Sequence, residues 1–207
     1  MAIINGINKD TIKNMQLDAG VILDGVINPE ADTISEKITQ NSLGATKGAT
    51  TFSAIPEIRN IFDGIDGVRG DIKNGNVIDK WEVTLKASVS EFTLKNLTTA
   101  LGATKNGSGV KYHTLEPSDE ISPENYKTIS WIGTMNSGND PIIIVLNNCL
   151  NMNGLTITAE DKNTGLIEIE LRAHIDLAHT ETKQFKIYLP KNSPGKMLDS
   201  KELKLDK

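Results

Sequence analysis

The sequence predicts a mainly β protein, an antiparallel β-sandwich with one flanking α-helix and long loops. Residues 81–89 alternate apolar and polar side chains, and so do the positions from Ile167 to Leu177, which is typical of strands with one buried face. A third run, from Ile142 to Leu146, is continuously apolar and fits a strand that is buried on both faces. Strands joined by close turns favour antiparallel pairing.

Weaker signals complete the predicted sheet. We expect further strands at 17–27, 51–61, 67–72, 155–159 and 184–189. The Asn-Gly pair at 74–75 favours a type I′ hairpin turn. Residues 161–165 (Asp-Lys-Asn-Thr-Gly) form a turn that separates the 155–159 strand from the long alternating one.

One helix is predicted from its capping residues and its apolar stripe. Thr93 is a suitable N-cap, Gly102 can end the helix, and an apolar stripe is expected to face the sandwich through Leu94, Leu97, Ala100 and Leu101. A second helix, from Thr33 to Gln40, has the capping-box pattern of Thr33 and Glu36, but its few apolar residues leave a mobile loop as the alternative.

Length and polarity indicate one domain with two long loops. Residues 1–190 are expected to form this domain, including polar, Gly-rich or Pro-containing loops at 28–50 and 102–128. Loops of this length in a compact domain are usually functional or disordered. Residues 191–207 are predicted to be a polar C-terminal tail.

Composition excludes several classes of protein. The 207 residues are 38% apolar and 24% charged, which is typical of a soluble globular protein. The net charge of −5 and the lack of a basic cluster argue against a protein that wraps nucleic acid. The longest apolar run, 141–146, is too short to span a bilayer, and the start resembles no signal peptide. We therefore expect a protein that stays inside the cell or leaves it by lysis.

No catalytic, cofactor or metal residue is predicted, and we expect the chain not to be an enzyme. A single cysteine, Cys149, excludes an intrachain disulfide and thiolate zinc sites, and it is interpreted as a small buried hydrophobe. His174 and His179 are five residues apart and would point to opposite faces of a strand, so a solvated strand edge is favoured over a metal site with Asp176. The glycine-rich stretch 102–109 lacks the Lys-Ser/Thr pair of a phosphate loop, and 63–67 lacks the spacing of a calcium loop.

A set of short segments occurs in a fixed order between residues 17 and 190. The segments are 17–21 (Leu-Asp-Ala-Gly-Val), 43–52 (Leu-Gly-Ala-Thr-Lys-Gly-Ala-Thr-Thr-Phe), 56–59, 66–70, 81–102, 131–133 (Trp-Ile-Gly), 161–162, 173–177 (Ala-His-Ile-Asp-Leu) and 185–190 (Phe-Lys-Ile-Tyr-Leu-Pro). Together they resemble the major tail (tail tube) proteins of long-tailed bacteriophages that infect Gram-positive hosts. Residues 102–128 and those after Pro190 have no counterpart in this match.

The resemblance implies a structural function in the virion tail, after assembly in the host cytoplasm. Such proteins form hexameric rings that stack into a tube around a tape-measure protein, are closed by tail-terminator proteins, and let DNA pass without specific binding. Inner sheets join edge to edge around the channel, and a long loop between early strands reaches the next ring. No cofactor and no membrane is implied.

This implied architecture suggests two sets of candidate residues. The candidate lumen-facing residues lie on the polar side of the long strand and carry a charge of −2 with histidine neutral: Glu168, Glu170, Arg172, His174 and Asp176. The candidate inter-ring loop residues lie in the 28–50 segment: Thr33, Glu36, Lys37, Thr46 and Lys47.

Three alternatives remain open. A tube subunit of a phage-like bacteriocin or of a secretion particle would share the fold. A monomeric ligand-binding β-sandwich, such as a carbohydrate-binding one, is disfavoured because sugar sites need aromatic platforms and aromatic residues make up only 4% of the chain. A hydrolase that uses the neighbouring acids Glu168 and Glu170 is weaker still.

Overall fold

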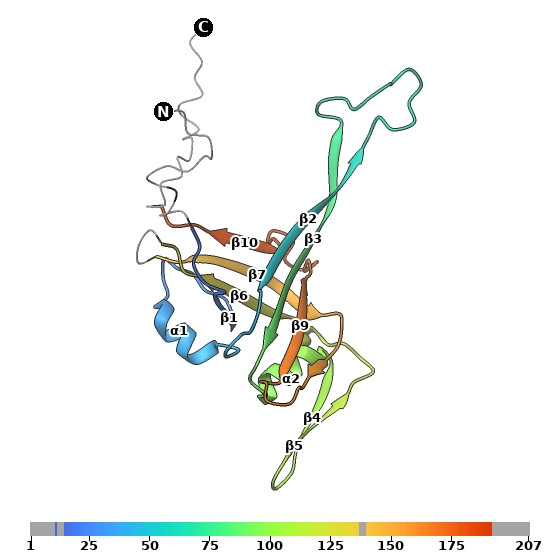
Figure 1. The fold of residues 1–207 in the computed structure, drawn as a ribbon. Helices are drawn as coiled ribbons and strands as arrows, with labels where there is room; N and C mark the ends of the chain where they lie inside the picture. The colour runs from blue at the N-terminus through green and yellow to red at the C-terminus, as the bar shows by residue number, and fades with distance from the viewer. Residues whose placement is uncertain (1–10, 12–14, 137–139, 192–207) are drawn as a thin grey trace.

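The computed structural model describes residues 11, 15–136 and 140–191 (Figure 1). Apart from Lys191, the predicted C-terminal tail lies outside the described residues. The chain is mainly β, and every strand pair is antiparallel. The predicted fold class is confirmed at this level.

Within the described residues, eight strands form one sheet and two form a separate hairpin. The sheet contains β1 (Val21–Asp24), β2 (Thr51–Asn60), β3 (Asn76–Val89), β6 (Lys127–Gly133), β7 (Ile142–Asn151), β8 (Thr156–Thr158), β9 (Leu166–Ala173) and β10 (Phe185–Tyr188). Its order is β1-β6-β7-β9-β3-β2, with β10 also paired to β7 and β8 to β9. The hairpin consists of β4 (Thr104–Ser108) and β5 (His113–Pro117). The helices are α1 (Ile34–Asn41) and α2 (Leu94–Leu101), with a 3₁₀ turn at Pro123–Asn125.

The sheet changes direction along β7. One edge of this strand pairs with β6 from Ile142 to Cys149. The other edge pairs first with β10, from Ile143 to Leu146, and then with β9, from Cys149 to Asn151. Asn148, at the junction, has a positive φ of 51°. In Figure 1, β6, β7 and β10 run across the view, whereas β2, β3 and β9 run steeply. The two parts share one apolar core, and the rings of Phe52 and Trp81 pack edge-on against Phe185.

Strand β7 is covered on both faces, which explains its continuous apolar run. One face contributes Ile144 and Leu146 to the main core. The other face contributes Ile143 and Val145 to a second cluster, against which Ile34 and Ile38 of α1 pack, as part of a short amphipathic helix. The prediction of a strand buried on both faces is confirmed.

Helix α2 has the predicted ends but a different buried face. The Thr93 hydroxyl accepts a hydrogen bond from the Asn96 backbone N–H, and Gly102 ends the helix at a φ of 77°. The buried residues are Asn96, Thr99 and Ala100, whereas Leu94 is 38% exposed. The predicted leucine stripe is therefore wrong in part, because a two-turn helix beside β7 and β9 buries only a narrow strip.

The loops and some weak strands differ from prediction. The 28–50 segment contains α1, although Thr33 makes no side-chain cap hydrogen bond. The 102–128 segment contains the β4–β5 hairpin. Residues 67–72 form no strand and are mostly irregular; at their start, the Val68 N–H donates to the Ile65 carbonyl. Strand β6 was not predicted. Over the described part of the chain, no helix has the length and apolar character needed to span a membrane.

Candidate functional surfaces

The first candidate surface is the solvent side of the β2–β3–β9–β8 part of the sheet. Alternation sends the odd residues of β9 from Ile167 to Ala173 into the core and the even ones outward. We call the outward side the polar face; besides the exposed Ile55, its residues are Thr51, Ser53, Glu82, Thr84, Lys86, Ser88, Thr156, Glu168, Glu170 and Arg172. The predicted alternation is confirmed in β9 as far as Ala173 and in most of β3, where Thr84 lies on the outward side but is buried.

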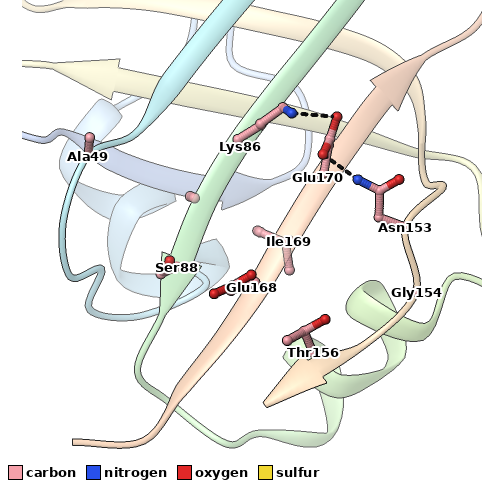
Figure 2. A pocket seen from close by; sticks show the side chains of 10 residues that line it. Ala49, Lys86, Ser88, Asn153, Gly154, Thr156, Glu168, Ile169 and Glu170 are labelled. Atoms are coloured by element: carbon pink, nitrogen blue, oxygen red, sulfur yellow. Dashed lines mark hydrogen bonds and ion pairs between the residues drawn. The ribbon is translucent and has the colours of Figure 1, made fainter. Parts of the chain in front are cut away.

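Cross-strand ion pairs neutralise much of this surface. Lys86 stands opposite Glu170 in the strand register, and its Nζ lies 2.9 Å from the Glu170 carboxylate. Arg172 pairs in the same way with Glu82. Figure 2 shows Lys86 and Asn153 both reaching Glu170, with Asn153 placed on the loop between β7 and β8. Among the described residues no ion pair is found for Glu168, so it is the carboxylate of this face that keeps an uncompensated charge.

The predicted lumen-facing residues do not all lie together. Glu168, Glu170 and Arg172 share the polar face, but β9 ends at Ala173. The His174 N–H donates to the Asn148 carbonyl, its ring stacks edge-on against Tyr126, and the side chain is half-buried. Asp176 lies in a turn, where its carboxylate accepts a hydrogen bond from the Ala178 N–H. The prediction of one continuous strand to Leu177 is therefore wrong.

The charge of the face changes accordingly. Glu82 and Lys86, which belong to it, were not among the predicted residues, and Asp176 does not belong to it. Three carboxylates stand against Lys86 and Arg172, which gives −1 instead of −2. A hollow of about 280 Å³ lies on the face between Lys86, Thr156 and Glu168. The hydroxyl and amide groups around it offer no concentrated positive charge to hold a polyanion.

The second candidate surface is a long hairpin that projects from the body. We call residues 56–80, the outer part of β2 and β3 with the loop between them, the arm (Figure 1). Cross-strand ion pairs hold its strands: Arg59 with Asp79 at 3.0 Å and Lys80 with Glu57 at 2.8 Å. These contacts raise the pKa of Arg59 and of Lys80 above their usual values, chiefly through hydrogen bonds to the partner carboxylates.

The arm exposes a large apolar surface to solvent. Six large aliphatic side chains on it are 40–56% exposed: Ile58, Ile61, Ile65, Ile72, Val77 and Ile78. At its base, a groove of about 460 Å³ is lined in part by Ile78, Trp81, Ile175 and Phe185. Apolar patches of this kind, rimmed by charges, mark interaction surfaces.

Strand β2 forms one edge of the sheet. In the described part of the chain it pairs with β3 alone, which leaves its outer N–H and C=O groups open. Pro56 within the strand is compatible with an edge position, where its missing N–H breaks no ladder bond. A long open edge is a template for pairing with another chain.

The predicted inter-ring residues lie against the body rather than on a projecting loop. Thr33, Glu36 and Lys37 belong to the start of α1, and Lys37 pairs with Asp32 at 3.5 Å. Thr46 forms a β-bridge with Val89, and the Lys47 N–H donates to the Ser88 carbonyl. The helix predicted from Thr33 to Gln40 is present as α1, and a role for these five residues between rings stays a prediction.

Reactive side chains are few and dispersed. Cys149 is 1% exposed, and burial raises the pKa of its thiol to about 12. His179 lies 3.0 Å from Asp176, and this hydrogen bond lowers the pKa of that carboxyl. No group of three or more His, Cys, Asp or Glu side chains suited to a metal ion is present where the structure is described.

Sequence reasoning missed the arm because its residues were assigned to separate strands at 51–61 and 67–72, with a hairpin turn only at 74–75. The signal that could have found it is the density of Ile and Val across 55–78, where turn residues interrupt the pattern. Such residues in an extended hairpin have no core of their own to enter. A comparison with protein-family models and one with curated proteins gave no match to this chain.

Proposed function

We propose that this chain is the structural subunit of a phage tail tube, which forms hexameric rings that stack around a channel for DNA. The observation that carries the proposal is the arm, with its six exposed aliphatic side chains. In a monomer these side chains contribute no free energy of burial, whereas a second copy packed on the arm removes their apolar area from water.

The position of the arm fits the stacking that the sequence resemblance implies. It lies between β2 and β3, which are early strands of the sheet, and it extends beyond the body (Figure 1). A loop between early strands is the element expected to reach the next ring. We therefore propose that the arm, rather than the 28–50 segment, makes the principal stacking contact.

The polar face supports the channel part of the proposal. In a ring, the open edge of β2 pairs with a neighbouring sheet and the polar faces join into one wall. This wall carries hydroxyl groups, neutralised ion pairs and the uncompensated Glu168. A surface of weak negative charge repels phosphates slightly and offers them no site of long residence.

Arm variants test the proposal. Ile65→Asp with Ile72→Asp places charge on exposed arm positions and is expected to abolish stacking into tubes, as measured by light scattering and sedimentation. The matched control, Ile65→Val with Ile72→Val, keeps the arm apolar and is expected to assemble normally. Unchanged thermal midpoints in both variants would show that the fold is intact. Normal assembly of the aspartate variant would contradict the proposal.

The alternative functions differ in whether they predict assembly into rings. A tube from a bacteriocin-like or secretion particle predicts the same rings, and the contents of the lumen would separate it from an infectious phage. A monomeric ligand-binding sandwich predicts no concentration-dependent assembly.

A further inference from the structure

We infer that the β4–β5 hairpin of one subunit binds the loop of the arm on a subunit in the next ring. This inference rests on the proposed tube function and names the surface that receives the arm. We call residues 104–117 the ribbon and residues 61–75 the arm loop.

The ribbon projects from the body as a sheet of its own. Among the described residues, its two strands pair only with each other and not with the main sheet. At its tip, the Val110 side chain is fully exposed and Tyr112 is 79% exposed. An isolated two-stranded hairpin is marginally stable in water, so a ribbon of this kind gains stability from a surface that covers it.

The ribbon and the arm lie at opposite ends of the molecule. Figure 1 shows the arm loop at the top and the ribbon tip at the bottom of the same view. When copies stack in one direction, the top of each meets the bottom of the next. A head-to-tail contact joins two different surfaces, so the two projections can be complementary without being alike.

Their charges are opposite. The arm loop carries Asp63, Asp66 and Asp71 against two basic residues, a net −1. The ribbon carries Lys105 and Lys111 against a single Glu, a net +1 with His113 neutral.

Most of these charges have no partner within the subunit. In the described structure, neither an ion pair nor a side-chain hydrogen bond is found for Asp63, Asp66, Lys105 or Lys111. All four side chains are exposed. They are therefore available to a second copy, and they set the register of the contact.

Apolar groups on each side complete the match. The arm loop exposes Ile61, Ile65 and Ile72, and the ribbon tip exposes Val110 and Tyr112. Tyrosine supplies a large contact area at a small cost in side-chain entropy. Each projection thus presents apolar side chains beside exposed charges, which sum to −1 on the arm loop and to +1 on the ribbon.

Charge reversal provides the first test. Lys105→Glu with Lys111→Glu, and separately Asp63→Lys with Asp66→Lys, are each expected to raise the protein concentration needed for stacking about tenfold at low salt. Combining all four changes is expected to restore stacking. The charge-conserving variant, Lys105→Arg with Lys111→Arg, is the control and should stack like the unmodified chain.

The outcomes separate this inference from the function on which it rests. Rings that stack normally in both reversed variants, or a combined variant that stacks no better than either, would overturn the ribbon–arm contact and leave the tube function standing. Absence of rings in the unmodified chain would overturn the tube function, and with it this inference.

Cross-linking provides a second, geometric test. Val110→Cys and Ile65→Cys are introduced together, and the buried Cys149 remains in place. Oxidation of assembled tubes is expected to give a ladder of covalent multimers from the double variant and none from either single variant. Tubes without a ladder, or a covalent dimer from Val110→Cys alone, would contradict the proposed pairing.

Discussion

Hydrogen bonds from single buried side chains hold the long loops against the core. Asn96 of α2 is 3% exposed, and its Nδ2 donates to the Leu43 carbonyl at 2.7 Å and to the Glu91 carbonyl at 2.8 Å. Through these bonds one amide holds the segment after α1, the end of β3 and the start of α2 together. The sequence could not predict this, because an Asn in a helix is ordinarily a surface residue.

Replacing Asn96 tests its structural importance. Asn96→Ala leaves buried carbonyl oxygens without their donor, which costs about 1–3 kcal/mol of stability for each unsatisfied group. Asn106→Ala, at an exposed position of β4, is the control and should change the free energy of unfolding little. Urea denaturation measures both. Equal midpoints for the two variants would refute the assigned function of Asn96.

The buried thiol gives a second residue-scale prediction. Because burial raises the pKa of Cys149 to about 12, the folded chain should resist a thiol reagent at about pH 8 and react only after unfolding. Val110→Cys adds an exposed thiol and should react at once in the folded state. Stability should also fall as pH rises from about 9 towards 12, since the unfolded thiol ionises first. Rapid labelling of the folded unmodified chain would contradict this account.

For the strands, the regular hydrophobic patterns were predictable from the sequence, but the residues at which the strands end were not. The alternation in β3 and β9 and the apolar run in β7 follow directly from which faces are buried. The alternation of apolar and polar residues continues to Leu177 in the sequence, but the strand ends at Ala173. Beyond it, the Asp176 carboxylate accepts a hydrogen bond from the Ala178 N–H and forms a turn. Strand β6 was missed because Ser130 is fully buried and donates to the Gly25 carbonyl, which breaks the apolar pattern.

The end of α2 offers a test at this scale. Gly102 has a φ of 77°, and a Cβ added there would lie 3.0 Å from the Asn151 carbonyl oxygen. Gly102→Ala is expected to cost about 1–2 kcal/mol from backbone strain alone, plus the cost of this close approach. Gly154→Ala has a similar φ of 71° in open space and is the matched control. Equal unfolding free energies for the two variants would mean that the Asn151 carbonyl moves aside freely.

At the scale of the whole molecule, the sequence predicted the polar face more fully than the projections. The periodicity of the sequence identifies the solvent-exposed side of a strand. It does not identify the ion pairs that neutralise this side, because they join residues distant in the sequence, such as Glu82 and Arg172. The arm and the ribbon were not predicted from the burial pattern, because they do not enter the core. Their residues follow no burial pattern that a single subunit imposes.

The polar face yields a prediction for the assembled tube. Glu168→Lys with Glu170→Lys changes its charge from −1 to +3. Tubes should still form, because the core side of β9 is unchanged, but DNA should be retained in the channel most strongly at low salt. Co-sedimentation of DNA with tubes at several salt concentrations measures this. Glu168→Gln, which removes charge without adding a cation, should retain little DNA; equal retention by all variants would place the face outside the channel.

The proposed function requires this chain to assemble into six-subunit rings that stack. Electron microscopy of the purified full chain over a range of protein concentrations would reveal such rings. We expect class averages with sixfold symmetry and a central channel, together with tubes of repeating rings at higher concentration. A particle that stays monomeric at every concentration, or a closed dimer without a channel, would contradict it.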